Sequence, residues 1–154
     1  MRVIAFLDKS NVKYEMTEHK PTFTAQHVAA AAHERGQYVA KPVMVKVDGK
    51  VVMCVLPASY KIDLKALKKQ MKAKKAELLT EEEMGRLFDD CELGAEPPFG
   101  NLYDMPTVID KSIEDDDHIL FQAGSHANAI RMSMADYMKL VAPDVLKFSY
   151  HMTS

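Results

Sequence analysis

The residues best suited to chemistry lie in a short loop, Gly-Ala-Glu-Pro-Pro-Phe-Gly, at positions 94–100. Each proline fixes its own φ angle and restricts the residue before it, so the middle of the loop is stiff. Gly94 and Gly100 permit the bends at its two ends. The prolines also remove two N–H donors, which leaves a backbone rich in carbonyl acceptors. Such a loop could hold a water, a hydroxyl or an ammonium group, although an ordinary connector has the same composition.

A second candidate is Lys46, a lysine among apolar residues. Residues 43–47 and 50–56 flank Asp48-Gly49, a pattern that predicts a β-hairpin with a two-residue turn. Both faces of this ribbon are apolar, which is typical of strands inside an α/β sheet. A buried amine is costly unless it is paired, and its pKa falls. Lys46 therefore either projects into a cleft and meets an anionic or carbonyl-bearing ligand, or extends to solvent at the rim of the sheet.

A third group, Gly124-Ser125-His126, follows a predicted strand. The adjacent serine and histidine raise the possibility of a serine hydrolase. However, the chain has no G-x-S-x-G motif, and neighbours on an extended backbone point in opposite directions. We therefore do not expect a catalytic triad. The acidic run at residues 114–117 lacks the spacing of a calcium-binding loop and is interpreted as a solvated turn.

The elements that must position these groups are a mixture of helices and strands. Thr24, Thr80 and Ser133 are good N-caps for three of the helices. The patterns predict a helix at 2–9, a strand at 12–16, a helix at 25–34, the hairpin, a lysine-rich helix from about 62, a helix from 81, strands at 105–110, 119–123 and 129–132, a helix from 134 and a terminal tail from 147.

Composition limits the classes of function. With 154 residues, 47% of them hydrophobic, the chain predicts one compact domain over 1–154. The net charge of −2 argues against a basic protein of the histone type, so any contact with nucleic acid must be local. Cys54 and Cys91 have no zinc-site or disulfide spacing, and we expect no metal. No apolar run reaches transmembrane length and no signal peptide is evident, which favours the cytoplasm.

Taken together, three motifs resemble the YbaK/prolyl-tRNA-synthetase-associated domain family. They are Val-Met-Val-Lys ending at Lys46, the G-x-x-x-P frame of Gly94 and Pro98, and Ala-Gly-Ser-His at 123–126. Members of that family are free-standing trans-editing aminoacyl-tRNA deacylases or the editing insertion of bacterial prolyl-tRNA synthetase. The resemblance covers nearly the whole chain. It implies an α/β (α+β) fold with a mixed, mostly antiparallel central sheet wrapped by helices, and no cofactor.

The resemblance also implies roles for individual residues. Lys46 matches a strand lysine that is essential for activity, and Gly94 and Pro98 shape the site through their backbone. The remaining candidates for substrate binding are Glu96, Pro97, Phe99, Gly100, Gly124, Ser125, His126 and His19. The implied partner is the 3′ end of an aminoacyl-tRNA, with an aminoacyl-tRNA synthetase as a further candidate, and neither DNA nor a membrane is expected.

The chemistry of such a site needs no strong nucleophile. An aminoacyl ester is already activated, so hydrolysis requires a placed water and stabilisation of the developing oxyanion. Lys46 could hold the terminal phosphate or polarise the ester carbonyl, and the substrate's own 2′-hydroxyl could assist. The alternative is a non-catalytic module that binds tRNA ends or a synthetase. Which amino acid is removed stays open.

Overall fold

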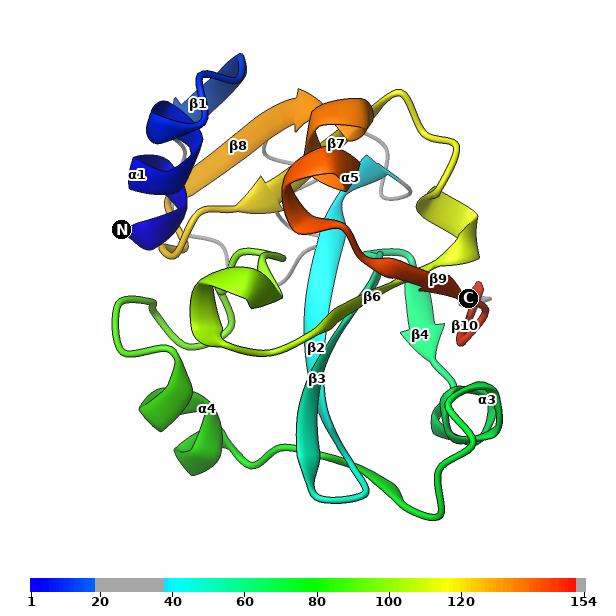
Figure 1. The fold of residues 1–154 in the computed structure, drawn as a ribbon. Coiled ribbons are helices and arrows are strands. Elements are labelled where there is room, and N and C mark those ends of the chain that lie inside the picture. The colour runs from blue at the N-terminus through cyan, green and yellow to red at the C-terminus, as the bar shows by residue number, and fades with distance from the viewer. Residues whose placement is uncertain (19–37, 152–154) are drawn as a thin grey trace.

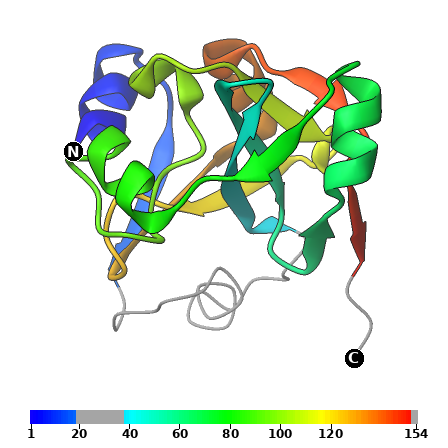
Figure 2. The same cartoon turned by 90° about the horizontal axis from the view of Figure 1, so that it is seen from below.

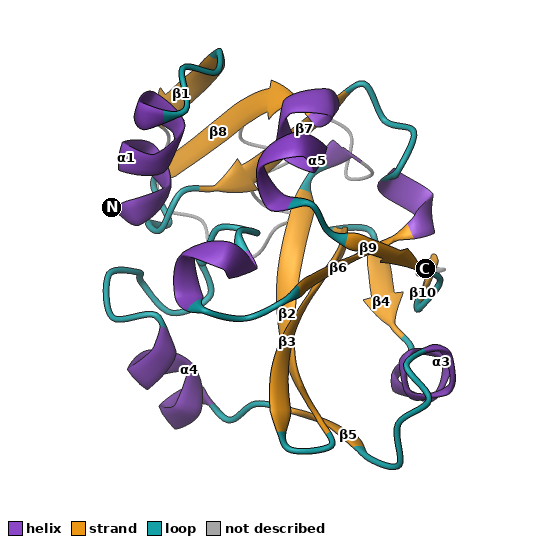
Figure 3. Cartoon of the chain, in the orientation of Figure 1, coloured by secondary structure: helices purple, strands orange, loops and turns teal. Residues whose placement is uncertain are grey.

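The structure is a computed structural model that describes residues 1–18 and 38–151. The predicted helix at 25–34 and the candidate residue His19 lie outside the described residues. The elements follow one another as shown in Figures 1 and 3. They are α1 (Arg2–Lys9), β1 (Tyr14–Glu18), β2 (Ala40–Val47), β3 (Lys50–Pro57), β4 (Tyr60–Ile62), α3 (Leu64–Gln70), β5 (Ala76–Leu78), α4 (Glu81–Leu87), η2 (Gly100–Tyr103), β6 (Thr107–Asp110), η3 (Lys111–Ile113), β7 (His118–Gln122), β8 (Asn128–Ser133), α5 (Met134–Val141), β9 (Asp144–Leu146) and β10 (Ser149–His151).

The largest sheet has five strands in the order β5-β2-β3-β6-β9. Its β5-β2-β3 half is antiparallel, whereas β6 runs parallel to both β3 and β9. A second sheet, β1-β8-β7, is antiparallel throughout, and β10 pairs with β4. A single bridge between Val39 and Leu120 joins the beginning of β2 to β7. The predicted mixed α+β architecture is confirmed.

The hairpin has the predicted turn and register. Asp48 and Gly49 both have positive φ angles, 48° and 86°, as a type I′ turn requires. Met44 pairs with Met53, and Lys46 pairs with Val51. The Asp48 carboxylate also accepts hydrogen bonds from the backbone N–H groups that precede β5. The turn is therefore tied to the neighbouring edge strand.

Strands β2 and β3 bury both of their faces because helices cover both faces of the sheet. Met44 and Met53 join a cluster that includes residues of α1 and α5. On the opposite face, Val45 and Val52 pack with Leu67 of α3. Helices α3 and α4 lie at either end of β5, as Figure 2 shows from below. This arrangement explains the continuous apolar runs in the hairpin.

The C-terminal region differs from the prediction. The residues expected to form a tail from 147 instead include β10, and β9 just before them completes the large sheet. Phe148 between these strands is fully buried, and its N–H donates to Asp110 Oδ1 at 2.8 Å. The tail prediction was wrong because each strand has only three residues and pairs with distant segments, so no local period marks it.

Candidate active site

A cavity of about 570 Å³ opens along one edge of β2. Strand β3 occupies the other edge along its whole length. On the open edge, β5 pairs only with Val45–Val47, and the bridge to β7 lies at Val39. The residues between them have no strand partner on that side within the described chain. The cavity is lined by Val39, Ala40, Lys41, Pro42, Val43, Met44, Ala58, Leu78, Leu79, Glu81, Met84, Leu93, Gly94, Glu96 and Gln122.

The front of the 94–100 loop forms one wall of this cavity. Gly94 and Glu96 both line it. Gly94 has a φ angle of 88°, and a Cβ there would lie 3.4 Å from the His126 ring. Glycine thus allows both the left-handed bend and the close approach of the histidine. Of the predicted loop, Gly94 and Glu96 are the residues that line the cavity.

The second half of the same loop, Pro97–Gly100, packs into the core. The Pro98 carbonyl accepts a hydrogen bond of 2.6 Å from the Tyr137 hydroxyl. Phe99 is fully buried and makes edge contacts with Phe121 and Tyr137. A Cβ on Gly100 would lie 2.4 Å from Thr107 Oγ1, so only glycine fits there. Pro97, Pro98, Phe99 and Gly100 do not line the cavity, and they hold its wall in place.

The 124–126 segment lies behind the loop. The Gly124 N–H donates to the Ala95 carbonyl at 2.8 Å, and His126 Nε2 lies 2.7 Å from the Leu93 carbonyl. Because a carbonyl can only accept, this ring nitrogen carries a proton. Ser125 Oγ accepts from the N–H of Ala127 at 3.0 Å. Gly124 therefore contacts the loop, His126 contacts the residue just before it, and Ser125 stabilises its own turn. None of the three lines the cavity.

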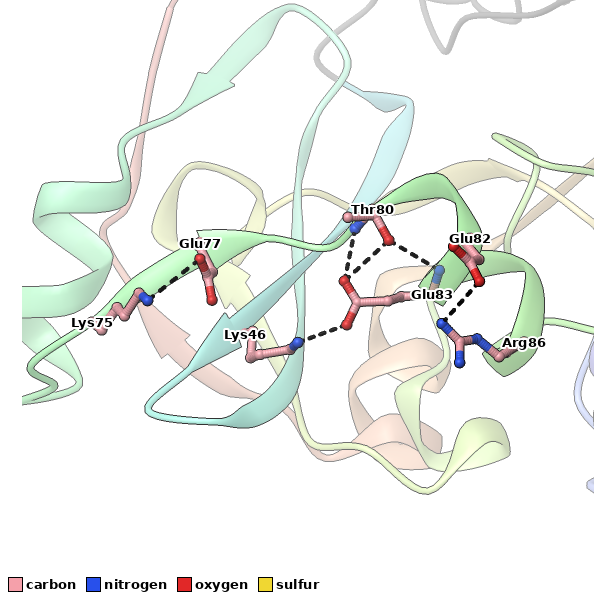
Figure 4. A network of polar contacts seen from close by, with 7 residues as sticks. All are labelled: Lys46, Lys75, Glu77, Thr80, Glu82, Glu83 and Arg86. Carbon is pink, nitrogen blue, oxygen red and sulfur yellow. Dashed lines mark hydrogen bonds and ion pairs between the residues drawn. The ribbon is translucent and has the colours of Figure 1, made fainter.

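Lys46, the predicted catalytic lysine, forms an ion pair with a helix residue. Its Nζ lies 2.6 Å from Glu83 Oε2, and Glu83 in turn forms the capping box of α4 with Thr80. Figure 4 shows this contact. The hydrogen bond from Lys46 and those from Thr80 lower the pKa of Glu83 to about 2, and Glu83 raises the pKa of Lys46. Lys46 does not line the cavity. Its ion pair with Glu83 links α4 to β2.

The lysine that does line the cavity is Lys41, which the sequence reasoning missed. It lies five positions before Lys46, an odd separation along a strand, so the two side chains leave the strand on opposite faces. Lys41 is half-buried, with Nζ 3.4 Å from the Ala58 carbonyl. No carboxylate of the described residues forms an ion pair with it. Burial, and secondarily the charge of Lys61, lower its pKa.

Pro42 is the residue from which the open edge of this part of the strand could have been predicted. Proline has no N–H for a ladder and within sheets is confined to edges, to first residues of strands and to bulges. It stands beside Lys41 and lines the cavity. A lysine next to a proline in a predicted strand thus indicates a charge at an open sheet edge.

Within the described residues, no helix combines the length and the apolar character needed to cross a membrane. The same residues contain no group of three or more His, Cys, Asp or Glu side chains placed to hold a metal ion.

Comparison with known proteins identifies the family. The family model described as "Aminoacyl-tRNA editing domain" matches residues 19–140. The chain belongs to this family. The predicted family is therefore confirmed, together with the predicted class of activity, aminoacyl-tRNA editing. The matched region contains β2, the 94–100 loop and most of α5.

Two relatives and one solved structure agree with this assignment. The chain is 26% identical to the multifunctional Ser/Thr-tRNA deacylase ProXp-y of Escherichia coli strain K12, over 96% of this chain and 90% of the relative. It is also 26% identical to the prolyl-tRNA editing protein ProX of Acetoanaerobium sticklandii, over 90% and 88%. A structure described as a candidate trans-editing enzyme for prolyl-tRNA synthetase superposes with a TM-score of 0.84 at 17% identity, covering 97% of this chain and 95% of that one. The last similarity concerns the fold.

Proposed function

We propose that this editing domain hydrolyses the ester of a mischarged aminoacyl-tRNA in the cavity at the open edge of β2, with Lys41 as its catalytic cation. The observation that carries the proposal is the meeting of Lys41 with Gly94 and Glu96 around one cavity. A half-buried amine without a carboxylate partner among the described residues is suited to binding an anion or a developing negative charge.

The size of the cavity supports an aminoacyl ester as the ligand. Ligand pockets are typically about 300–1,000 Å³ and mostly apolar, with a few placed polar groups. At about 570 Å³, this cavity has room for a small amino acid and part of the terminal adenosine. Leu78, Leu79 and Met84 make one side apolar, while Lys41 and Glu96 supply charges.

The reaction follows from these parts. A water oxygen attacks the ester carbonyl carbon, and the carbonyl oxygen becomes an oxyanion that the Lys41 ammonium stabilises. The intermediate collapses, the C–O bond to the ribose breaks, and the ribose oxygen leaves with a proton. The products are a free amino acid and a tRNA with its terminal hydroxyl restored. The adjacent ribose hydroxyl is suited to orient the water, and the partly buried site strengthens the attraction to Lys41.

The amino acids that we propose as substrates are small. Serine and threonine are the first candidates because the relative from Escherichia coli is named for them. Alanine and cysteine are close in size. One methylene changes binding by only about 1–3 kcal/mol, so a cavity of this kind discriminates gradually among neighbours in size.

A deacylation panel tests this function. Purified protein is incubated with tRNAs that carry labelled serine, threonine, alanine or cysteine, in the presence of EDTA, and release of the amino acid is followed. We expect release of at least one amino acid well above the uncatalysed rate. Binding of these tRNAs without release would contradict the proposal and would favour the non-catalytic tRNA-binding module.

A further inference from the structure

The cavity contains a second buried charge that the hydrolytic step described above does not use. Glu96 is only 4% exposed, yet it lines the cavity together with Lys41. Buried carboxylates are ordinarily paired with a cation or well supplied with donors. We therefore ask which group, in the chain or in a ligand, is the partner of the Glu96 carboxylate.

The partners of Glu96 within the chain are few. Both carboxylate oxygens accept from the same N–H group, that of Gly94, at 3.1 and 2.8 Å. No lysine, arginine or histidine of the described residues forms an ion pair with it. An ionised carboxylate has about four lone-pair sites, so acceptor capacity remains. Burial dominates and raises the pKa of Glu96 above its ordinary value, although the backbone N–H groups and the nearby His126 act in the opposite direction.

The chemistry of the substrate provides a matching group. Every aminoacyl ester carries an α-ammonium group one carbon away from the ester carbonyl. Lys41 repels that ammonium group and attracts the carbonyl oxygen, whereas Glu96 attracts the ammonium group. A substrate held between the two charges therefore has its carbonyl directed towards Lys41.

We propose that Glu96 binds the α-ammonium group of the aminoacyl ester, so that the cavity selects esters with a free amine over N-acylated esters. This inference rests on the proposed function and adds a requirement to it. The chemical class excluded is that of N-blocked aminoacyl-tRNAs, in which the amine is an uncharged amide.

The test compares two forms of one substrate. Seryl-tRNA, or whichever ester of the panel is released fastest, is prepared with its amine free or N-acetylated, and kcat/KM is measured for both. For the unaltered protein we expect a preference for the free amine of about 10- to 100-fold, the range typical of a hydrogen bond to a charged group. Equal rates for the two forms would overturn the inference even if no variant could be studied.

Variants separate binding from support of the loop. Glu96→Gln should lower kcat/KM for the free-amine ester about tenfold or more and leave the N-acetyl ester unchanged, and Glu96→Asp should recover part of the preference. Glu92→Gln, an exposed change in the same segment, is the matched control and should behave like the unaltered protein. An equal loss for both esters in Glu96→Gln would show that Glu96 only shapes the loop. Failure of the unaltered protein to release either ester would instead contradict the proposed function.

Discussion

Strand β2 carries a lysine near each end, and the two have opposite surroundings. Lys46 lies where β5 pairs with the strand, and its amine is 2.6 Å from Glu83. Lys41 lies where the strand edge is open and lines the cavity, and its amine has no carboxylate partner among the described residues. The environment raises the pKa of the first and lowers that of the second. An amine already paired with a carboxylate of the protein stabilises the fold, whereas one without such a pair is available to a ligand.

The largest difference between the two lysines should be in catalysis. Lys41→Met should lower kcat/KM for deacylation by about 10²-fold, the usual loss when one group that stabilises an oxyanion is removed. Lys46→Met should change it little. Rates are measured on the same mischarged tRNA, with circular dichroism to show that both variants are folded. A large loss in Lys46→Met with Lys41→Met unaffected would reverse the assignment.

The pH dependence of the rate should reveal the lowered pKa of Lys41. The ammonium form is the active one, so catalysis should be present below that pKa and should decline as the pH rises through it. The decline should begin below the ordinary lysine value of about 10.4. Rates are corrected for spontaneous hydrolysis, which increases with pH.

Two variants sharpen this pH test. In Lys61→Gln the decline should move to higher pH, because one of the two causes of the shift is removed. In Lys41→Arg, any residual activity should lose the part of the decline that belongs to Lys41, because arginine stays charged. A decline that is unchanged in both variants would mean that another group titrates.

The smallest effect should be on stability and should belong to Lys46. The pKa of Glu83 is about 2 in the folded protein, below its ordinary value, so the pair stabilises the fold at neutral pH. That contribution disappears as the pH falls through the range between the two values. Lys46→Met should lower Tm by a few degrees at neutral pH, and the difference from the unaltered protein should shrink on acidification. A difference that grows towards acid pH would contradict this role.

Local sequence patterns anticipated the parts of the molecule whose contacts are local. The turn at Asp48-Gly49 set the register of the hairpin, and Thr80 with Glu83 formed the predicted capping box. The candidate site was only partly predictable. Gly94 and Glu96 line the cavity, but Pro98 is held from behind by Tyr137, a contact across 39 positions.

The choice between the two lysines also depended on distant contacts. Lys46 has apolar neighbours in the chain, which suggested an unsatisfied amine, but Glu83 reaches it from another element. Lys41 lay outside the predicted strand at 43–47, whereas the observed strand begins at Ala40. Which edge of a strand stays open is decided by the strands that pair with it, and β5 is too short to carry a clear pattern of its own.

The most direct test of the account is an NMR titration of the lysine side chains. A non-hydrolysable analogue, adenosine with the amino acid attached through a 3′-amide, is added to protein labelled at the lysine side chains. We predict that the Lys41 amine shows a lowered pKa in the free protein and that its signals shift on addition of the analogue, while those of Lys46 stay in place. A shift at Lys46 with none at Lys41 would contradict the claim that the open edge of β2 is the active site.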